Sequence, residues 1–208
     1  MRALFYDTET GDLDPEKGSL LAVGALVIDI ASGEIFDKME MLHKLPSKDD
    51  YKVTPKALEK NKLSIDICFN EGVPADEIAA RLMDMYLENS CLLAGGHNSV
   101  HFDDPWLAIH LYGLKSGIQL FQQVFTNAHP IDTQHYMRLI QGLENTKVGS
   151  GSLKKMVNVL GVDTSKAKKL LHCRGSYHES PLFDAWCASE CAKIIYQNMN
   201  MWIPNKGI

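Results

Sequence analysis

Two acidic residues near the start of the chain have the type and spacing of metal ligands. Asp7 ends a predicted strand at residues 2–7, and Glu9 follows it. On an extended segment, residues two positions apart project from the same face, so these carboxylates would lie side by side. A cation between them relieves their repulsion, and carboxylate oxygens are the hard ligands that Mg²⁺ and Mn²⁺ prefer. The pair indicates a divalent metal site, although a solvated strand end could have the same residues.

A second polar group, residues 97–104, follows an apolar run at 91–94 that predicts a buried strand. Ligand-contacting groups of open α/β sheets gather at the carboxyl ends of strands, which makes Asp103 a further candidate ligand. Asp104 stands before Pro105, the order expected for a helix N-cap followed by proline at the first helical position. Asp103 is left without an equally simple structural role.

The third group combines a histidine with an acid in the first turns of a helix. Ser180, followed by proline, predicts the N-cap, which makes Asp184 the fourth residue of that helix, where the helix dipole still favours an anion. His178 precedes the helix and has the ordinary pKa range of a general base that takes a proton from water. His97 and His101, by contrast, are expected to pack or to form hydrogen bonds rather than to catalyse.

Two other groups of residues leave alternatives open. Cys187 and Cys191, at helical spacing, could form a zinc site with Cys173 and His172, but packing in an apolar core explains buried cysteines as well. One stretch is densely basic and is either a solvated surface or a track for phosphates. Its members are Lys154, Lys155, Lys166, Lys168, Lys169 and Arg174.

The elements that would position these groups alternate between strand and helix patterns. Apolar runs predict strands at 2–7, 20–30, about 35–41, 91–94 and 121–126. Helical patterns cover 74–89, a segment starting at 104, and 133–141, 152–160 and 180–199. Residues 44–73 are polar and irregular, so they are expected to lack regular structure. The order predicts a single α/β domain over residues 1–208 whose first three strands form an antiparallel meander.

Composition narrows the class of protein. The chain has 208 residues, 45% of them hydrophobic, and a formal net charge of -5. That balance suits a globular protein, and its acidity argues against a protein that grips a duplex along many phosphates. Five cysteines without a CxxC spacing, and no long uncharged apolar stretch, predict an intracellular, cytoplasmic protein outside the membrane.

The three groups together resemble the DEDD superfamily of 3′–5′ exonucleases, in its histidine branch, which includes proofreading subunits, ribonuclease-T-like enzymes and exonuclease-I-like domains. The family's strand leading into Asp-x-Glu-Thr matches residues 6–10, and its His-Asn followed by Phe-Asp matches residues 97–103. Its histidine ahead of Asp-Ala matches His178 and residues 184–185. The resemblance covers nearly the whole chain.

The sequence departs from the family pattern at each of the three motifs. The first motif commonly continues Thr-Thr-Gly-Leu, whereas residues 10–13 here are Thr-Gly-Asp-Leu and lack the second threonine. The segment from Asn98 to Asp103 is one residue longer than the commonest form, as in the exonuclease-I group. His178 and Asp184 are also one residue farther apart than usual, which bears on where His178 lies. Tyr177 does not fit the tyrosine branch, because the position that branch gives to tyrosine is Ser180 here.

The resemblance implies a fold, a reaction and a cofactor. The fold would be ribonuclease-H-like, a mixed five-stranded sheet with its first three strands antiparallel and flanked by helices. Two Mg²⁺ or Mn²⁺ ions would be held by Asp7, Glu9, Asp103 and Asp184, with His178 as the base.

The substrate implied by the resemblance is the 3′ end of a single-stranded nucleic acid, hydrolysed to nucleoside monophosphates. Thr10 and Leu13 would meet the terminal nucleotide. A catalytically inactive binding or scaffold module of the same fold is the alternative. DNA versus RNA stays open, as does assembly as a homodimer or with a polymerase or repair partner.

Overall fold

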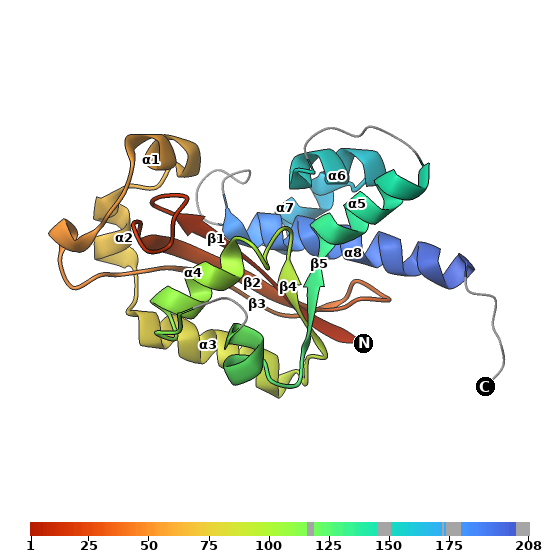
Figure 1. Cartoon of the computed structure of the whole chain (residues 1–208), viewed down its shortest axis with the longest axis horizontal. Coiled ribbons are helices and arrows are strands. Elements are labelled where there is room, and N and C mark those ends of the chain that lie inside the picture. Colours follow the sequence, from red (N-terminus) through yellow and green to blue (C-terminus); the bar gives the residue numbers. More distant parts are fainter. Residues whose placement is uncertain (116–118, 145–150, 172, 174–179, 203–208) are drawn as a thin grey trace.

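The structure is a computed structural model. It describes residues 1–115, 119–144, 151–171, 173 and 180–202 (Figure 1). Its strands are β1 (Arg2–Thr10), β2 (Leu20–Asp29), β3 (Ile35–Leu42), β4 (Leu93–Gly96) and β5 (His129–Asp132). Its longer helices are α1 (Pro55–Asn61), α2 (Ile65–Glu71), α3 (Ala75–Glu88), α4 (Asp103–His110), α5 (Thr133–Glu144), α6 (Leu153–Leu160) and α8 (Pro181–Trp202). Shorter turns are η1 (Lys48–Asp50), η2 (Leu120–Val124), η3 (Thr164–Lys166) and α7 (Ala167–Leu170).

The five strands form one mixed sheet in the order β3-β2-β1-β4-β5. β1 pairs antiparallel with β2, and β2 pairs antiparallel with β3. β4 runs parallel to β1, and β5 runs parallel to β4. This arrangement confirms the predicted mixed five-stranded sheet with an antiparallel meander first.

Side chains that alternate along β1 serve two cores on opposite faces of the sheet. Ala3 and Phe5 pack with residues of α8, whereas Leu4 and Tyr6 pack with residues of α3 and α4. Figure 1 shows α8 running across one side of the sheet, with α3 below it. β1 is therefore the buried centre of the molecule, and the residues at its end are held from both sides.

Two sequence-based predictions of local structure are wrong. Residues 44–73 contain η1, α1 and α2, whose N-caps are Ser47, Thr54 and Ser64. The polar composition of this segment led to the prediction that it lacks regular structure. Residues 120–124 form a single helical turn, η2, instead of the predicted strand at 121–126. The fifth strand is β5, an edge strand that contains Pro130. An edge strand tolerates proline, but proline within a short run argues against a strand when the sequence alone is considered.

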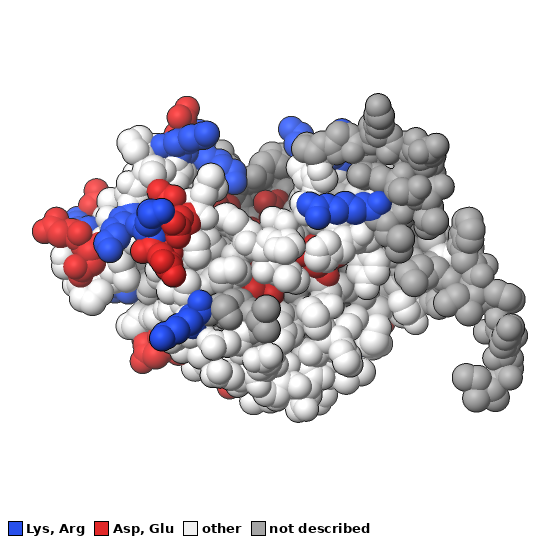
Figure 2. Space-filling view, in the orientation of Figure 1, with Lys and Arg blue, Asp and Glu red and all other residues white. Residues whose placement is uncertain are grey.

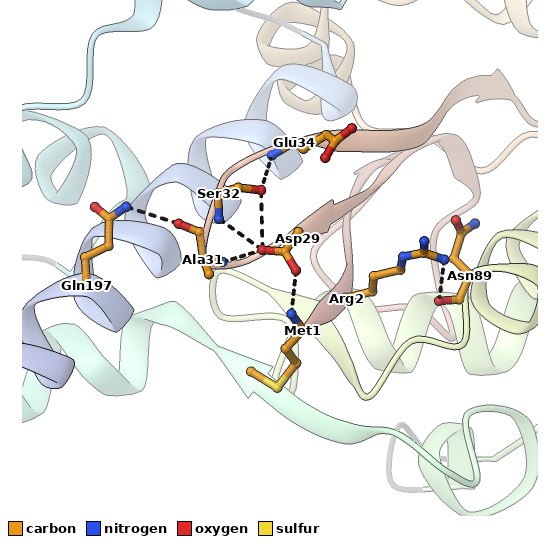
Figure 3. A network of polar contacts seen from close by, with 8 residues as sticks. All are labelled: Met1, Arg2, Asp29, Ala31, Ser32, Glu34, Asn89 and Gln197. Atoms are coloured by element: carbon orange, nitrogen blue, oxygen red, sulfur yellow. Dashed lines mark hydrogen bonds and ion pairs between the residues drawn. The ribbon is translucent and has the colours of Figure 1, made fainter. Parts of the chain in front are cut away.

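The turn between β2 and β3 is built around the carboxylate of Asp29 (Figure 3). Its Oδ1 accepts hydrogen bonds from the main-chain nitrogens of Ala31 and Ser32, at 2.9 and 3.0 Å. Its Oδ2 forms an ion pair with the amino group of Met1. From α8, Gln197 donates to the carbonyl oxygen of Ala31, at 3.2 Å. The turn thus joins the start of β1 to the final helix.

In the described part of the chain, none of the helices is both long enough and apolar enough to cross a lipid bilayer.

Candidate active site

Asp7 and Glu9 lie near the end of β1, each partly buried, while Thr8 and Thr10 between and after them are buried. Asp7 faces Gly24 across the β1–β2 ladder, and the register shifts between Glu9 and Thr10. The predicted extended geometry of the two acids is confirmed. Their alternation with the threonines places both carboxylates on one side of the strand.

Gly24 allows α8 to approach this part of the sheet. A β-carbon at Gly24 would lie 2.0 Å from the main-chain nitrogen of Leu182 and 2.3 Å from the carbonyl carbon of Pro181, so no side chain fits there. The first turn of α8 begins as predicted, with the Ser180 hydroxyl accepting from the nitrogen of Phe183 at 3.2 Å. This close packing brings Asp184, the fourth residue of α8, over the strand that carries Asp7.

Asp103 and Asp104 occupy the first turn of α4, and the predicted N-cap role of Asp104 is wrong. The cap position is Phe102, which makes no side-chain cap bond, and the helix begins at Asp103. Asp104 is instead buried and accepts a hydrogen bond from the hydroxyl of Tyr6, at 2.7 Å. A carboxylate buried against the sheet needs a hydrogen-bond donor, and the Tyr6 hydroxyl supplies it. Asp104 therefore bonds to Tyr6 instead of capping the helix. Burial raises the pKa of both Asp103 and Asp104 to about 7.

The four predicted acids interact electrostatically. Burial raises the pKa of Asp7 well above its ordinary value, and the charges of Asp103, Asp184 and Glu9 raise it further, in that order. The positive charge of Lys60 opposes them. Figure 2 shows acidic side chains on the floor of a hollow between α1 and the α5–α6 pair, with basic side chains on both rims. Acids from β1, α4 and α8 are thus gathered at one edge of the sheet.

This donor set suits a hard divalent cation. Carboxylates that raise one another's pKa are stabilised by positive charge between them, and the set is made of oxygen donors. Within the described ranges, no three histidine, cysteine, aspartate or glutamate side chains are already arranged as around a bound metal ion. The acids therefore fit a cation in number and in chemistry.

The predicted histidines have different outcomes. His178 lies outside the described residues, so its position relative to Asp184 is not part of the site described. His97 is a hydrogen-bonding residue, as predicted: Nδ1 lies 2.9 Å from the Thr133 hydroxyl and Nε2 lies 2.7 Å from the Gly151 carbonyl oxygen. His101 is exposed, and its ring packs edge-on against His135.

The two predicted substrate-binding residues occupy different environments. Leu13 is 82% exposed, in the loop between β1 and β2. Thr10 is buried, and its hydroxyl donates to the carbonyl of Asp12 at 2.8 Å. Its own carbonyl accepts a hydrogen bond of 2.8 Å from Asn61. The side chain of Leu13 is therefore exposed, whereas the Thr10 hydroxyl is already engaged in a hydrogen bond.

Of the three cysteines that could have bound zinc, Cys187 and Cys191 lie in the core and Cys173 is partly buried beside it. Cys187 and Cys191 are buried among apolar residues between α8 and the sheet. Burial raises the pKa of the Cys191 thiol to about 12, and it raises that of Cys187 still further. Protonated thiols in an apolar core favour the packing interpretation. His172 lies outside the described residues, as does Arg174 of the basic stretch.

Reasoning from the sequence missed the contribution of α1. Asn61 and Lys60 end this helix, which lies beside the end of β1. The capping pattern at Thr54-Pro55 could have predicted the helix. Its docking could not have been predicted, because the Asn61–Thr10 bond joins residues 51 positions apart.

Solved structures share this architecture. E. coli exonuclease I in complex with a dT13 oligonucleotide matches with a TM-score of 0.72 and 17% identity, over 97% of this chain and 42% of that chain. The zinc-bound form of an E. coli exonuclease I complex with single-stranded DNA matches with a TM-score of 0.74 and 18% identity, over 96% and 41% of the two chains. A further exonuclease I structure gives 0.73 and 20%, over 94% and 41%.

The likeness establishes the fold. At these identities it supports the ribonuclease-H-like architecture and says nothing by itself about activity. The chain spans about two fifths of the length of those exonuclease I chains. Neither a protein-family model nor the sequence of a curated protein matches it.

Proposed function

We propose that this chain is a metal-dependent 3′–5′ exonuclease of the histidine branch of the DEDD superfamily, forming one exonuclease domain over residues 1–208. It would hydrolyse the terminal phosphodiester of single-stranded DNA or RNA and release nucleoside monophosphates. The observation that carries the proposal is the electrostatic grouping of Asp7, Glu9, Asp103 and Asp184 from three separate elements. A buried group of like charges is unfavourable for folding, and such groups are characteristic of functional sites.

The fold gives independent support. The three solved structures described above are those of exonuclease I, one in complex with a dT13 oligonucleotide and one in complex with single-stranded DNA. Cytoplasmic location and assembly as a homodimer or with a polymerase or repair protein stay predictions.

Asp7, Glu9, Asp103 and Asp184 would hold two Mg²⁺ or Mn²⁺ ions. Such ions, when bound, lower the pKa of a water and stabilise negative charge on the leaving 3′ oxygen. Asp7 and Glu9 lie on β1, the central strand, whose preceding residues pack into two cores on opposite faces of the sheet. His178 would accept the proton of the attacking water, and Leu13 would contact the terminal base.

Release of nucleotides from labelled single strands tests the proposal. Wild-type protein is incubated with DNA and RNA strands carrying free or blocked 3′ ends, in Mg²⁺, in Mn²⁺ and in EDTA. We expect metal-dependent release of mononucleotides from free 3′ ends, none by Asp7→Ala, and a large loss of rate by His178→Ala. Metal-dependent turnover by Asp7→Ala would refute the site. Binding of strands by the wild type without release in either metal would instead identify an inactive binding module.

A further inference from the structure

Thr8 makes two hydrogen bonds to a single oxygen of Asp103. Its main-chain nitrogen donates to Oδ1 at 2.9 Å, and its hydroxyl donates to the same atom at 2.7 Å. Thr8 is 5% exposed and Asp103 is 2% exposed, so water does not compete for these bonds. Hydrogen bonds to a charged acceptor are among the stronger ones in proteins.

The topology of the sheet explains why a main-chain donor is available at Thr8. The parallel pairing of β1 with β4 ends where Phe5 meets Gly95. Beyond that point the β4 side of β1 has no neighbouring strand, because the chain turns through residues 97–102 into α4. The carboxylate of Asp103 takes the place that a strand partner would have.

A second bond fixes the helix that carries Asp103. Tyr6, two positions before Thr8 on the same face of β1, donates to Asp104 at 2.7 Å. Adjacent acids at the start of α4 are therefore bound to alternate residues of one strand. Together, the contacts of Tyr6 and Thr8 set both the rotation of the first turn of α4 and the orientation of the Asp103 side chain.

We infer that Thr8 is a positioning residue for the metal site. By engaging Oδ1 with two donors, it fixes the Asp103 carboxylate and assigns the other oxygen, Oδ2, to the cation. This inference rests on the proposed function, since it takes Asp103 as a metal ligand. Residues that orient a ligand in this way commonly change metal affinity by about 10- to 100-fold when they are replaced.

The test measures metal binding directly, without nucleic acid or turnover. Mn²⁺ is titrated calorimetrically into wild type, Thr8→Val and Thr8→Ser. Valine has nearly the shape of threonine but lacks the hydroxyl donor, whereas serine retains it. We expect Thr8→Val to weaken Mn²⁺ binding by about 10-fold and Thr8→Ser to restore most of the wild-type affinity.

A matched control separates positioning from a general loss of stability. Thr133 is also fully buried, and its hydroxyl donates to the carbonyl of Gly96 at 3.2 Å, within a different network. Thr133→Val should lower the melting temperature but leave Mn²⁺ affinity unchanged. If Thr8→Val does not fold, as judged by circular dichroism, Thr8→Ala removes the same donor without adding an apolar methyl group.

The outcomes distinguish this inference from the proposed function. Wild-type affinity in folded Thr8→Val, or in folded Thr8→Ala, would overturn the positioning role while leaving the nuclease proposal intact. An equal loss of affinity in Thr133→Val would also overturn it. A wild-type protein that neither binds Mn²⁺ nor releases nucleotides would overturn the proposed function, and the role of Thr8 with it.

Discussion

The side-chain amide of Asn61, the last residue of α1, donates a hydrogen bond of 2.8 Å to the main-chain carbonyl of Thr10. The main-chain nitrogen of Thr54, at the other end of the helix, donates to the carbonyl of Gly11 at 2.8 Å. α1 is therefore attached at both ends to the segment that follows Glu9. This attachment holds one rim of the hollow above the acids.

Asn61→Ala should destabilise the protein. Asn61 is 5% exposed, and its removal leaves the buried carbonyl of Thr10 without this donor. We expect the free energy of unfolding to fall by about 1–3 kcal/mol in urea titrations. Glu59→Ala, an exposed change in the same helix, is the control and should alter stability little. Equal stabilities of the two variants would contradict a role for Asn61 in docking α1.

Lys60→Ala should weaken the binding of single-stranded substrate. Lys60 is exposed, and its positive charge lowers the pKa of Asp7. This effect opposes those of burial and of the neighbouring carboxylates, which raise that pKa. A phosphate entering the site would meet the same charge. We expect a higher KM with a smaller change in kcat, and a dependence of log KM on log salt concentration that is shallower by about 0.7.

Lys154→Ala, on α6, tests the basic stretch in the same assay. An unchanged KM would identify the exposed Lys154 as part of a solvated surface, and a raised KM would place it on a phosphate track. An unchanged salt dependence in Lys60→Ala would show that substrate phosphates do not approach α1.

Asp7→Asn should stabilise the metal-free protein. Because burial and neighbouring carboxylates raise the pKa of Asp7, the folded protein holds a proton there more tightly than the unfolded chain does. The stability that this group contributes is present below the ordinary pKa of an aspartate, about 3.9, and is lost as pH rises toward the folded-state value. In EDTA at about pH 8, the variant should therefore melt above wild type, by about 2–4 °C for each kcal/mol of repulsion removed.

The same comparison contains its own controls. The difference in melting temperature should shrink as the pH is lowered to about 4, where wild-type Asp7 is protonated in the folded state. Mg²⁺ should raise the melting temperature of wild type more than that of the variant. If the variant melts below wild type in EDTA at the higher pH, the charge of Asp7 does not destabilise the metal-free protein through repulsion by the neighbouring carboxylates.

The sequence allowed some parts of this site to be predicted because their signals are local. Asp7 and Glu9 end an apolar strand, and Ser180 caps the helix that carries Asp184. The hydrogen bond between Tyr6 and Asp104 could not be predicted, because the two residues are 98 positions apart. Local sequence indicated only that Asp104 would cap the helix. β5 was missed because four residues that include Pro130 carry too little pattern to identify a strand.

Asp29→Asn should lower stability in a manner that depends on pH. Hydrogen bonding to the Met1 amino group, together with the main-chain donors of Ser32 and Ala31, lowers the pKa of Asp29 to about 2. A lowered pKa contributes stability above the ordinary value of about 3.9, and that contribution is lost as pH falls toward 2. In chains that begin at Met1, urea unfolding should give a lower free energy of unfolding for the variant near neutral pH, and this difference should disappear as the pH falls toward 2.

Glu59→Gln, an exposed acid-to-amide change on α1, is the control for Asp29→Asn. A deficit of the same size at every pH would show that the turn depends on the shape of Asp29 rather than on its charge.

Gly24→Ala should affect both stability and catalysis, because Gly24 pairs with Asp7 across the sheet and packs against the first turn of α8. The added β-carbon would meet main-chain atoms of Pro181 and Leu182 at 2.3 and 2.0 Å, and backbone cannot move aside as a flexible side chain can. α8 must shift, at a cost of about 1–3 kcal/mol, and Asp184 moves with it relative to Asp7.

Gly151→Ala is the control, because its β-carbon would meet only the flexible side chain of Gln134, at 3.3 Å. We expect Gly24→Ala to lower kcat under conditions where it remains folded, and Gly151→Ala to retain more of it. Full activity in folded Gly24→Ala would show that hydrolysis does not depend on the close approach of α8 to β2, and Asp184 would lose its place among the proposed ligands.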